Sequence, residues 1–197
     1  YNAINIFAGH YKPYLLAAQV FFYHDQFNDA KGVLERAREN QVEFSPCLRL
    51  YEIKILRNLA ENREDREKIF PIAAELLSEH ENPDTDIEDL SEIEYEIGLL
   101  HWDNNDLDDA LTHLNTAIEQ NPDRMQYRMI RGHIHLDHGK YKAALTDYGA
   151  ARQQYEDSAV LHYNSGLCQE ALGMKMLAVE CFEEALKYKQ VHREACE

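Results

Sequence analysis

Residues 96–122 read EIGLLHWDNNDLDDALTHLNTAIEQNP, with apolar side chains at intervals of three and four on both sides of a polar corner at 104–106. That spacing is typical of amphipathic helices that bury one face. The segment closes on Asn121 and Pro122, a dipeptide that favours a turn. It is therefore predicted to form two helices joined by a tight corner.

The landmarks of this helix pair return twice, at an interval of 34 residues. Small residues recur once in the first helix and twice in the second: Gly98, Gly132 and Gly166; Ala110, Ala144 and Ala178; Ala117, Ala151 and Ala185. Larger residues between the two alanines are Leu114, Tyr148 and Phe182, and the corner positions hold Asn105, Gly139 and Gly173. The corner residues are of types that tolerate left-handed backbone, which a tight turn between helices requires.

Glycine inside a helix needs a physical reason, because it costs up to about 1 kcal/mol relative to alanine. The reason we infer is close approach of the two helices of each pair. The alanines lie seven apart on one stripe of the second helix, and the larger residue between them fills the remaining gap. These columns are explained by steric fit and not by catalysis.

This pattern resembles the tetratricopeptide repeat family, whose unit is a helix–turn–helix of about 34 residues. Pro122 stands where the family places its terminal proline, whereas Glu156 and Gln190 occupy that column in the next two units. The early aromatic column of the family is also missing, since Glu94, Arg128 and His162 stand there. The resemblance implies an all-α fold, a right-handed superhelical solenoid of antiparallel helix pairs.

Upstream, residues 11–44 fit a further repeat-like unit, with Ala30 and Ala37 in the alanine columns. Ala30 and Ala110 are 80 residues apart, which is more than two periods, so residues 45–90 are expected to be a degenerate repeat with an insertion. Ser45 and Pro46 suit a helix start.

That degenerate unit is predicted to hold a helix to about residue 59, a second helix over 64–78 and an acidic connector at 81–90. A capping box at 91–94 then restarts the regular array. The predicted division is 1–10, the tail of a preceding helix; 11–44; 45–90; 91–124; 125–158; and 159–197, a repeat with the start of a C-terminal cap.

The composition is that of a folded chain, with 45% apolar and 28% charged residues, and no apolar run is long enough for a membrane span. The chain starts at Tyr1, so we expect a piece of a longer protein. The net charge of −16 disfavours nucleic acid, which binds clustered Lys and Arg. An acidic surface fits either solubility alone or attraction to a basic partner.

The four cysteines, Cys47, Cys168, Cys181 and Cys196, have no CxxC pairing and no regular spacing to histidine. They predict reduced, mostly buried thiols and therefore an intracellular, cytoplasmic location.

The sequence motifs provide no candidate catalytic or metal site. His133, His135 and His138 look like a metal cluster, but at 100° per residue the first two point apart on a helix. A calcium loop beginning at Asp84 fails, because Asp89 stands where glycine is needed. No phosphate-binding loop or nucleophile motif is present. We therefore expect no enzyme activity, no metal and no cofactor.

The resemblance implies that the first helices of the stacked units line a concave groove. Its predicted residues are Glu92, Tyr95, Leu99 and Trp102; Gln126, Met129, His133 and Leu136; and Val160, Tyr163, Leu167 and Glu170. This stripe either packs on neighbouring helices or forms a trough for a partner's peptide or helix with apolar anchors and basic flanks.

The co-chaperone members of the family share this repeat and hold a chaperone's C-terminal carboxylate with Lys, Asn and Arg side chains. Here the matching places hold Tyr95, Leu99, Ile130, Val160 and Asn164, so the carboxylate clamp is excluded. Three hypotheses stand for the function. The chain is a peptide- or protein-binding scaffold, a self-assembly module that forms homo-oligomers, or the regulatory arm of a larger protein.

Overall fold

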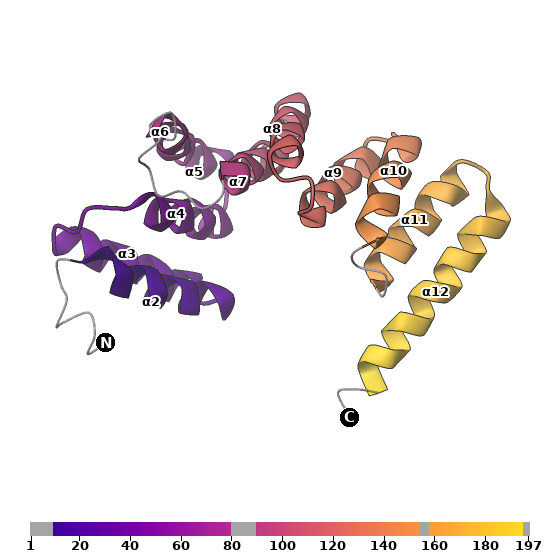
Figure 1. Ribbon diagram of the computed structural model, residues 1–197, viewed down its shortest axis with the longest axis horizontal. Coiled ribbons are helices and arrows are strands. Elements are labelled where there is room, and N and C mark those ends of the chain that lie inside the picture. The colour runs from indigo at the N-terminus through magenta and orange to yellow at the C-terminus, as the bar shows by residue number, and fades with distance from the viewer. Residues whose placement is uncertain (1–9, 80–89, 154–157, 195–197) are drawn as a thin grey trace. The chain divides into compact units, whose positions relative to one another are not determined.

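The computed structural model describes residues 10–79, 90–153 and 158–194, and within these ranges it contains helices and no strand (Figure 1). The predicted all-α fold is confirmed. The helices belong to two compact units, one up to Asp106 and one from Leu107 onward. Among the described helices, none is both long and apolar enough to cross a membrane.

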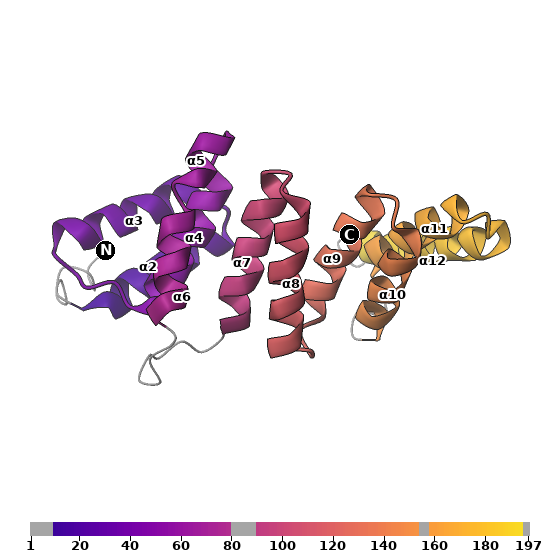
Figure 2. The same cartoon turned by 90° about the horizontal axis from the view of Figure 1, so that it is seen from above.

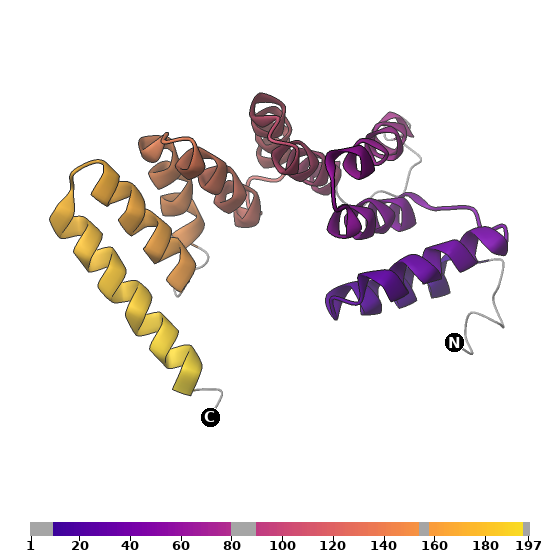
Figure 3. The ribbon, with the colours of Figure 1, turned by 180° about the vertical axis from the view of Figure 1, so that it is seen from behind.

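In the first unit the described helices are α2 (Tyr11–Tyr23), α3 (Phe27–Glu39), α4 (Pro46–Leu59), α5 (Arg63–Glu67), α6 (Phe70–Glu79) and α7 (Leu90–Asp103). In the second unit they are α8 (Leu107–Gln120), α9 (Met125–Asp137), α10 (Tyr141–Arg152), α11 (Ala159–Ala171) and α12 (Lys175–Glu194). Within the units, α2 with α3, α9 with α10 and α11 with α12 form antiparallel pairs that lie side by side (Figures 2 and 3).

The corners between paired helices have the backbone that the sequence predicted. The φ angle is 64° at Asn105, 68° at Gly139 and 77° at Gly173, and Asp25 takes the same role before α3 with φ of 56°. Asparagine and aspartate tolerate this region better than most side chains, and glycine enters it freely. The corner prediction is therefore confirmed.

The glycines inside the helices also have the predicted reason. A Cβ atom on Gly132 would lie 2.7 Å from Cε1 of Tyr148, and one on Gly166 would lie 2.5 Å from Cε1 of Phe182. Both distances are well below van der Waals contact. The alanines of the second helices are buried as expected, so small residues on both sides let the paired helices approach.

Helix starts were predicted with mixed success. Ser45 caps α4, since its hydroxyl accepts a hydrogen bond from the backbone N–H of Leu48, as expected. The predicted helix over 64–78 is wrong, because the structure breaks it into α5 and α6. Pro71 explains the break, since its ring would clash with the carbonyl of Glu67, where α5 ends.

The structure also corrects the prediction of a capping box at 91–94. Helix α7 already includes Leu90, so Ser91 lies inside its first turn, where it is buried. The acidic connector of 81–90 lies outside the described residues except for Leu90, and so does the predicted helix tail of 1–10 except for His10. Cys196 lies outside them as well.

Stacking of one helix pair on the next follows a simple rule. Each of the first helices α4, α7, α9 and α11 fully buries two side chains that lie seven residues apart. These are Leu48 and Ile55, Ile93 and Leu100, Tyr127 and Ile134, and Leu161 and Cys168. The α4 residues join the core of α2 and α3, those of α7 join the core of α6, and those of α11 join the core of α10.

Candidate functional site

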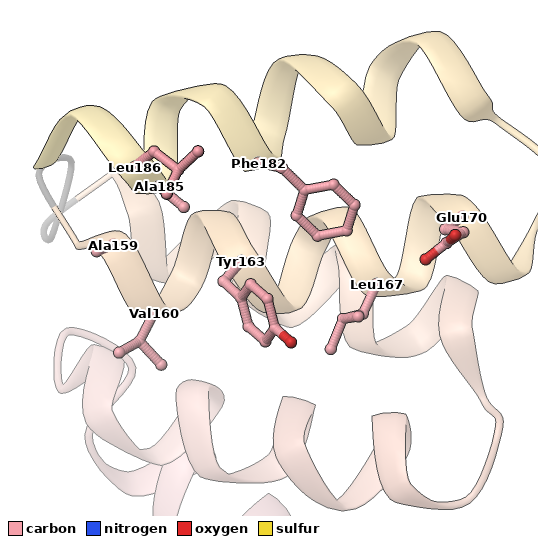
Figure 4. Close-up of a pocket in the computed structure, with 8 residues that line it drawn as sticks. All are labelled: Ala159, Val160, Tyr163, Leu167, Glu170, Phe182, Ala185 and Leu186. Carbon is pink, nitrogen blue, oxygen red and sulfur yellow. The ribbon is translucent and has the colours of Figure 1, made fainter. Parts of the chain in front are cut away.

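An open cavity of about 850 Å³ lies between α11 and α12 (Figure 4). Its lining residues are Ala159, Val160, Tyr163, Leu167, Glu170, Phe182, Ala185 and Leu186. Glu170, at one end of the row in the close-up, is the only acidic group among them. The cavity therefore suits an apolar ligand with a cationic group at one end.

The cavity exposes large apolar side chains to solvent. Tyr163 is 52% exposed and Leu186 is 66% exposed, and Val160 is more than half exposed. Single exposed apolar residues are common, but a contiguous group around a concavity is typical of an interaction site. The exposure is therefore informative because the residues are clustered.

Local sequence positions these side chains. Ser158 caps α11 by accepting a hydrogen bond from the backbone N–H of Leu161, and Val160 and Tyr163 follow in the first turns. Gly166 leaves room for Phe182, whose ring centroid lies 5.8 Å from that of Tyr163. Phe182 thus joins the two helices at the cavity.

The predicted groove residues of the last unit, Val160, Tyr163, Leu167 and Glu170, are brought together around this cavity. Sequence reasoning missed Phe182, Ala185 and Leu186 on the second helix, because it searched first helices alone. A signal was present: the column that holds Leu186 contains Arg152 one period earlier, so α12 stays apolar where the preceding repeat is charged.

The predicted groove residues of α9 have a different environment. Gln126 is exposed, whereas Met129, His133 and Leu136 are half-buried. Met129 and Leu136 pack against the hydrophobic core that contains Leu161 and Cys168 of α11. This part of the predicted stripe is partly covered by the following helix pair.

The predicted groove residues of α7 are more deeply buried, on the whole, than those of α9. Tyr95 is 7% exposed and Leu99 is 6% exposed, so they offer a partner little surface. Glu92 forms an ion pair with Lys54 of α4, and Trp102 is half-buried. None of the α7 or α9 residues lines the cavity at α11 and α12.

Ion pairs between α4 and α7 sit in a largely buried seam of the first unit. Besides the pair of Lys54 with Glu92, Nε of Arg57 donates to Oε2 of Glu96 over 3.0 Å. Burial raises the pKa of the Glu96 carboxyl, while the Arg57 charge opposes that rise. These contacts join the two helices.

The histidines singled out by the sequence have two different environments. His133 contacts the ring of Tyr148 at a centroid distance of 5.6 Å, whereas His135 and His138 line a small cavity of about 170 Å³ beside α8. Over the described residues, no group of three or more His, Cys, Asp or Glu side chains could hold a metal ion.

The half-buried histidines predict that stability falls in mild acid. Burial lowers the pKa of His133 and of His135, and the nearby carboxylates of Asp137 and Asp147 oppose this only in part. The unfolded chain therefore binds a proton at these histidines more readily than the folded chain. The neutral histidines contribute stability above their unfolded pKa of 6.5, and this contribution is lost as the pH falls below that pKa. Urea unfolding at about pH 7.5 and about pH 5.5 should show a lower free energy of unfolding in acid, with a smaller loss for His133→Gln. Equal losses in the two proteins would contradict the assignment to His133.

Comparisons with known proteins agree with the helix-pair fold. A sequence model described as tetratricopeptide repeat matches residues 95–159, and a second model with the same description matches residues 159–192. A search of curated protein sequences found no match.

Solved structures resemble the fold. The crystal structure of MamA protein is 15% identical, with 93% of each chain covered and a TM-score of 0.68. The crystal structure of YrrB, described as a TPR protein with an unusual peptide-binding site, is 18% identical, covering 98% of this chain and 93% of that chain with a TM-score of 0.63.

Proposed function

The chain belongs to the tetratricopeptide repeat family, and from this premise we propose that it is a non-enzymatic scaffold that binds a helix or peptide of another protein. The observation that carries the proposal is the apolar cavity between α11 and α12. The YrrB structure, whose description names a peptide-binding site, has the same fold and adds support at the level of fold alone.

The cavity defines the chemistry of the partner segment. An amphipathic helix with apolar residues at intervals of three and four would place its anchors against Tyr163, Leu167 and Leu186. A Lys or Arg near one end of the segment would approach Glu170. The net charge of −16 further favours partners with basic flanks, mainly by speeding their encounter.

The predicted groove residues of α9 and α7 contribute to partner binding in proportion to their exposure. We propose that Gln126, Met129, His133 and Leu136 extend the binding surface along α9, and that Glu92 and Trp102 offer a smaller surface on α7. Tyr95 and Leu99 contribute little to that surface because they are nearly covered. The partner is a protein and not a nucleic acid, given the excess of acidic residues.

A cytoplasmic location remains part of the proposal. Cys47, Cys168 and Cys181 form no disulfide among the described residues, which suits a reducing compartment.

Replacing Tyr163 with alanine should weaken partner binding by about thirtyfold or more, because truncating a central aromatic anchor typically costs about 2 kcal/mol. The measurement is capture of partners on the immobilised chain, followed by titration of the purified partner that is lost. Met176→Ala is the matched control, since Met176 is a 77% exposed apolar residue of α12 outside the cavity. Equal partner affinity for the two variants, both folded by circular dichroism, would remove the cavity from the function.

A further inference from the structure

A second, smaller cavity lies beside the start of α8 and the end of α9. We propose that it binds a phosphate ion. The cavity measures about 170 Å³, and the lining residues that matter here are Leu107, Asp108, Ile134, His135, His138 and Lys140. None of them lines the cavity between α11 and α12, so this site is independent of the proposed scaffold function.

The size of the cavity selects a small ligand. Pockets for drug-sized ligands and cofactors typically enclose about 300–1,000 Å³, so a nucleotide or an organic cofactor exceeds this one. A water molecule takes about 30 Å³ in the liquid. The cavity therefore has room for one tetrahedral oxyanion and a few water molecules.

Cationic groups outnumber carboxylates around the cavity, which reverses the balance of the whole chain. The lining holds two histidines and a lysine against one aspartate, Asp108, whereas the chain has 36 acidic residues against 20 Lys and Arg. Lys140 is charged at neutral pH, and the two imidazoles become charged on protonation. The local positive charge favours an anion.

His135 lacks a counter-charge of its own. Its Nε2 lies 4.0 Å from Oδ2 of Asp147, but both oxygens of that carboxylate already accept hydrogen bonds from Arg131. Its Nδ1 is buried and has no hydrogen-bond partner among the described residues. Burial lowers the pKa of His135, which the Asp147 charge opposes, and the positive charges of Arg131, Lys140 and His138 lower it further. An anion in the cavity would supply the charge and the acceptor that a protonated His135 lacks.

The repeat pattern shows that this lining is not a general feature of the fold. One period later, the columns of Leu107 and His138 hold Tyr141 and Leu172. Tyr141 packs against the core of the following interface, between α10 and α11. That interface stacks one helix pair on the next without the cationic lining, so stacking alone does not require it.

Asp108 decides which oxyanion fits. A carboxylate repels an anion that carries no proton, such as sulfate at neutral pH, whereas a protonated phosphate can donate its O–H to a carboxylate oxygen. Lys140 and a protonated His135 would donate to the other phosphate oxygens. Phosphate is therefore expected to bind in preference to sulfate.

NMR titration of the 197-residue chain tests the site. Phosphate is added at about pH 6, where histidine titrates, while sodium chloride keeps the ionic strength constant. The ring signals of His135 are identified by their absence from His135→Gln. We expect these signals to shift in a saturable way, and the pKa of His135 to be higher in phosphate than in chloride. Sulfate should bind at least about tenfold more weakly.

Substitutions in the lining test the role of each charge. Lys140→Met should weaken phosphate binding about tenfold, because it removes a charged donor. Lys142→Met is the matched control, since Lys142 is exposed and lies outside the lining, and it should bind phosphate like the unchanged chain. Asp108→Asn should bind sulfate about as well as phosphate, because an amide can donate to either anion.

A shift that does not saturate, or that sulfate produces equally, would overturn the proposal. Equal affinities of Lys140→Met and Lys142→Met for phosphate would overturn it too, as would a preference for phosphate that persists in Asp108→Asn. None of these outcomes bears on partner binding, which Tyr163→Ala tests separately.

Discussion

Replacing Arg131 with methionine is expected to lower the free energy of unfolding by about 3 kcal/mol, because it leaves a buried carboxylate without its partner. Nη2 and Nε of Arg131 donate to the two oxygens of Asp147 over 2.6 and 2.9 Å, and Nη1 donates to Asn115 Oδ1 over 2.6 Å. The Asp147 side chain is only 3% exposed. One guanidinium thus connects α8, α9 and α10 through hydrogen bonds.

Urea denaturation followed by circular dichroism measures this effect. The control is Arg63→Met, because Arg63 pairs with Glu67 and Asp106 at the surface, where solvent screens ion pairs and their contribution to stability is small. A comparable loss in the two variants would show that Asp147 finds another partner or water when Arg131 is removed.

Replacing Gly132 with valine should destabilise the chain by about 1–3 kcal/mol through overpacking. The added Cβ would lie 2.7 Å from Cε1 of Tyr148, whose side chain is fully buried. The gain in helix propensity over glycine is less than about 1 kcal/mol and does not offset this clash.

Gly149→Val is the matched control, since a Cβ at Gly149 meets nothing within 4 Å. It lies in the helix opposite Gly132 and should be neutral or slightly stabilising. The same urea titration compares the two variants. A neutral Gly132→Val would mean that α9 and α10 separate easily and that close approach is not what the glycine serves.

The regular repeats could be predicted because their columns are set by steric contact. Gly132 with Tyr148 and Gly166 with Phe182 are pairs in which one small residue requires one large residue, so they recur at a fixed interval. The corner residues Asn105 and Gly139 recur for an equally local reason, because the tight turn requires a positive φ that few residue types adopt.

The irregular unit was harder to predict because its features depend on tertiary context. The break at Pro71 could have been found, since a proline clashes with the carbonyl four residues before it. The ion pairs of Lys54 and Arg57 with Glu92 and Glu96 could not, because their partners lie in another helix with no periodic relation in the sequence.

The candidate site was predicted in part for the same reason. Tyr95 and Tyr163 occupy one column of the repeat, yet one is almost covered and the other is half exposed. The residue type is the same, and what differs is the neighbouring structure. A pattern that recurs along the chain identifies a face but does not show where its covering helix is absent.

The central claim is that the cavity between α11 and α12 receives a helix, and a photo-crosslinking residue in place of Leu186 tests it most directly. Irradiation in the presence of the partner captured on the immobilised chain, followed by mass spectrometry, should yield crosslinks to one segment of that partner, and the same residue at Met176 should yield none. Crosslinks that are absent at Leu186, or no more frequent there than at Met176, would contradict the account.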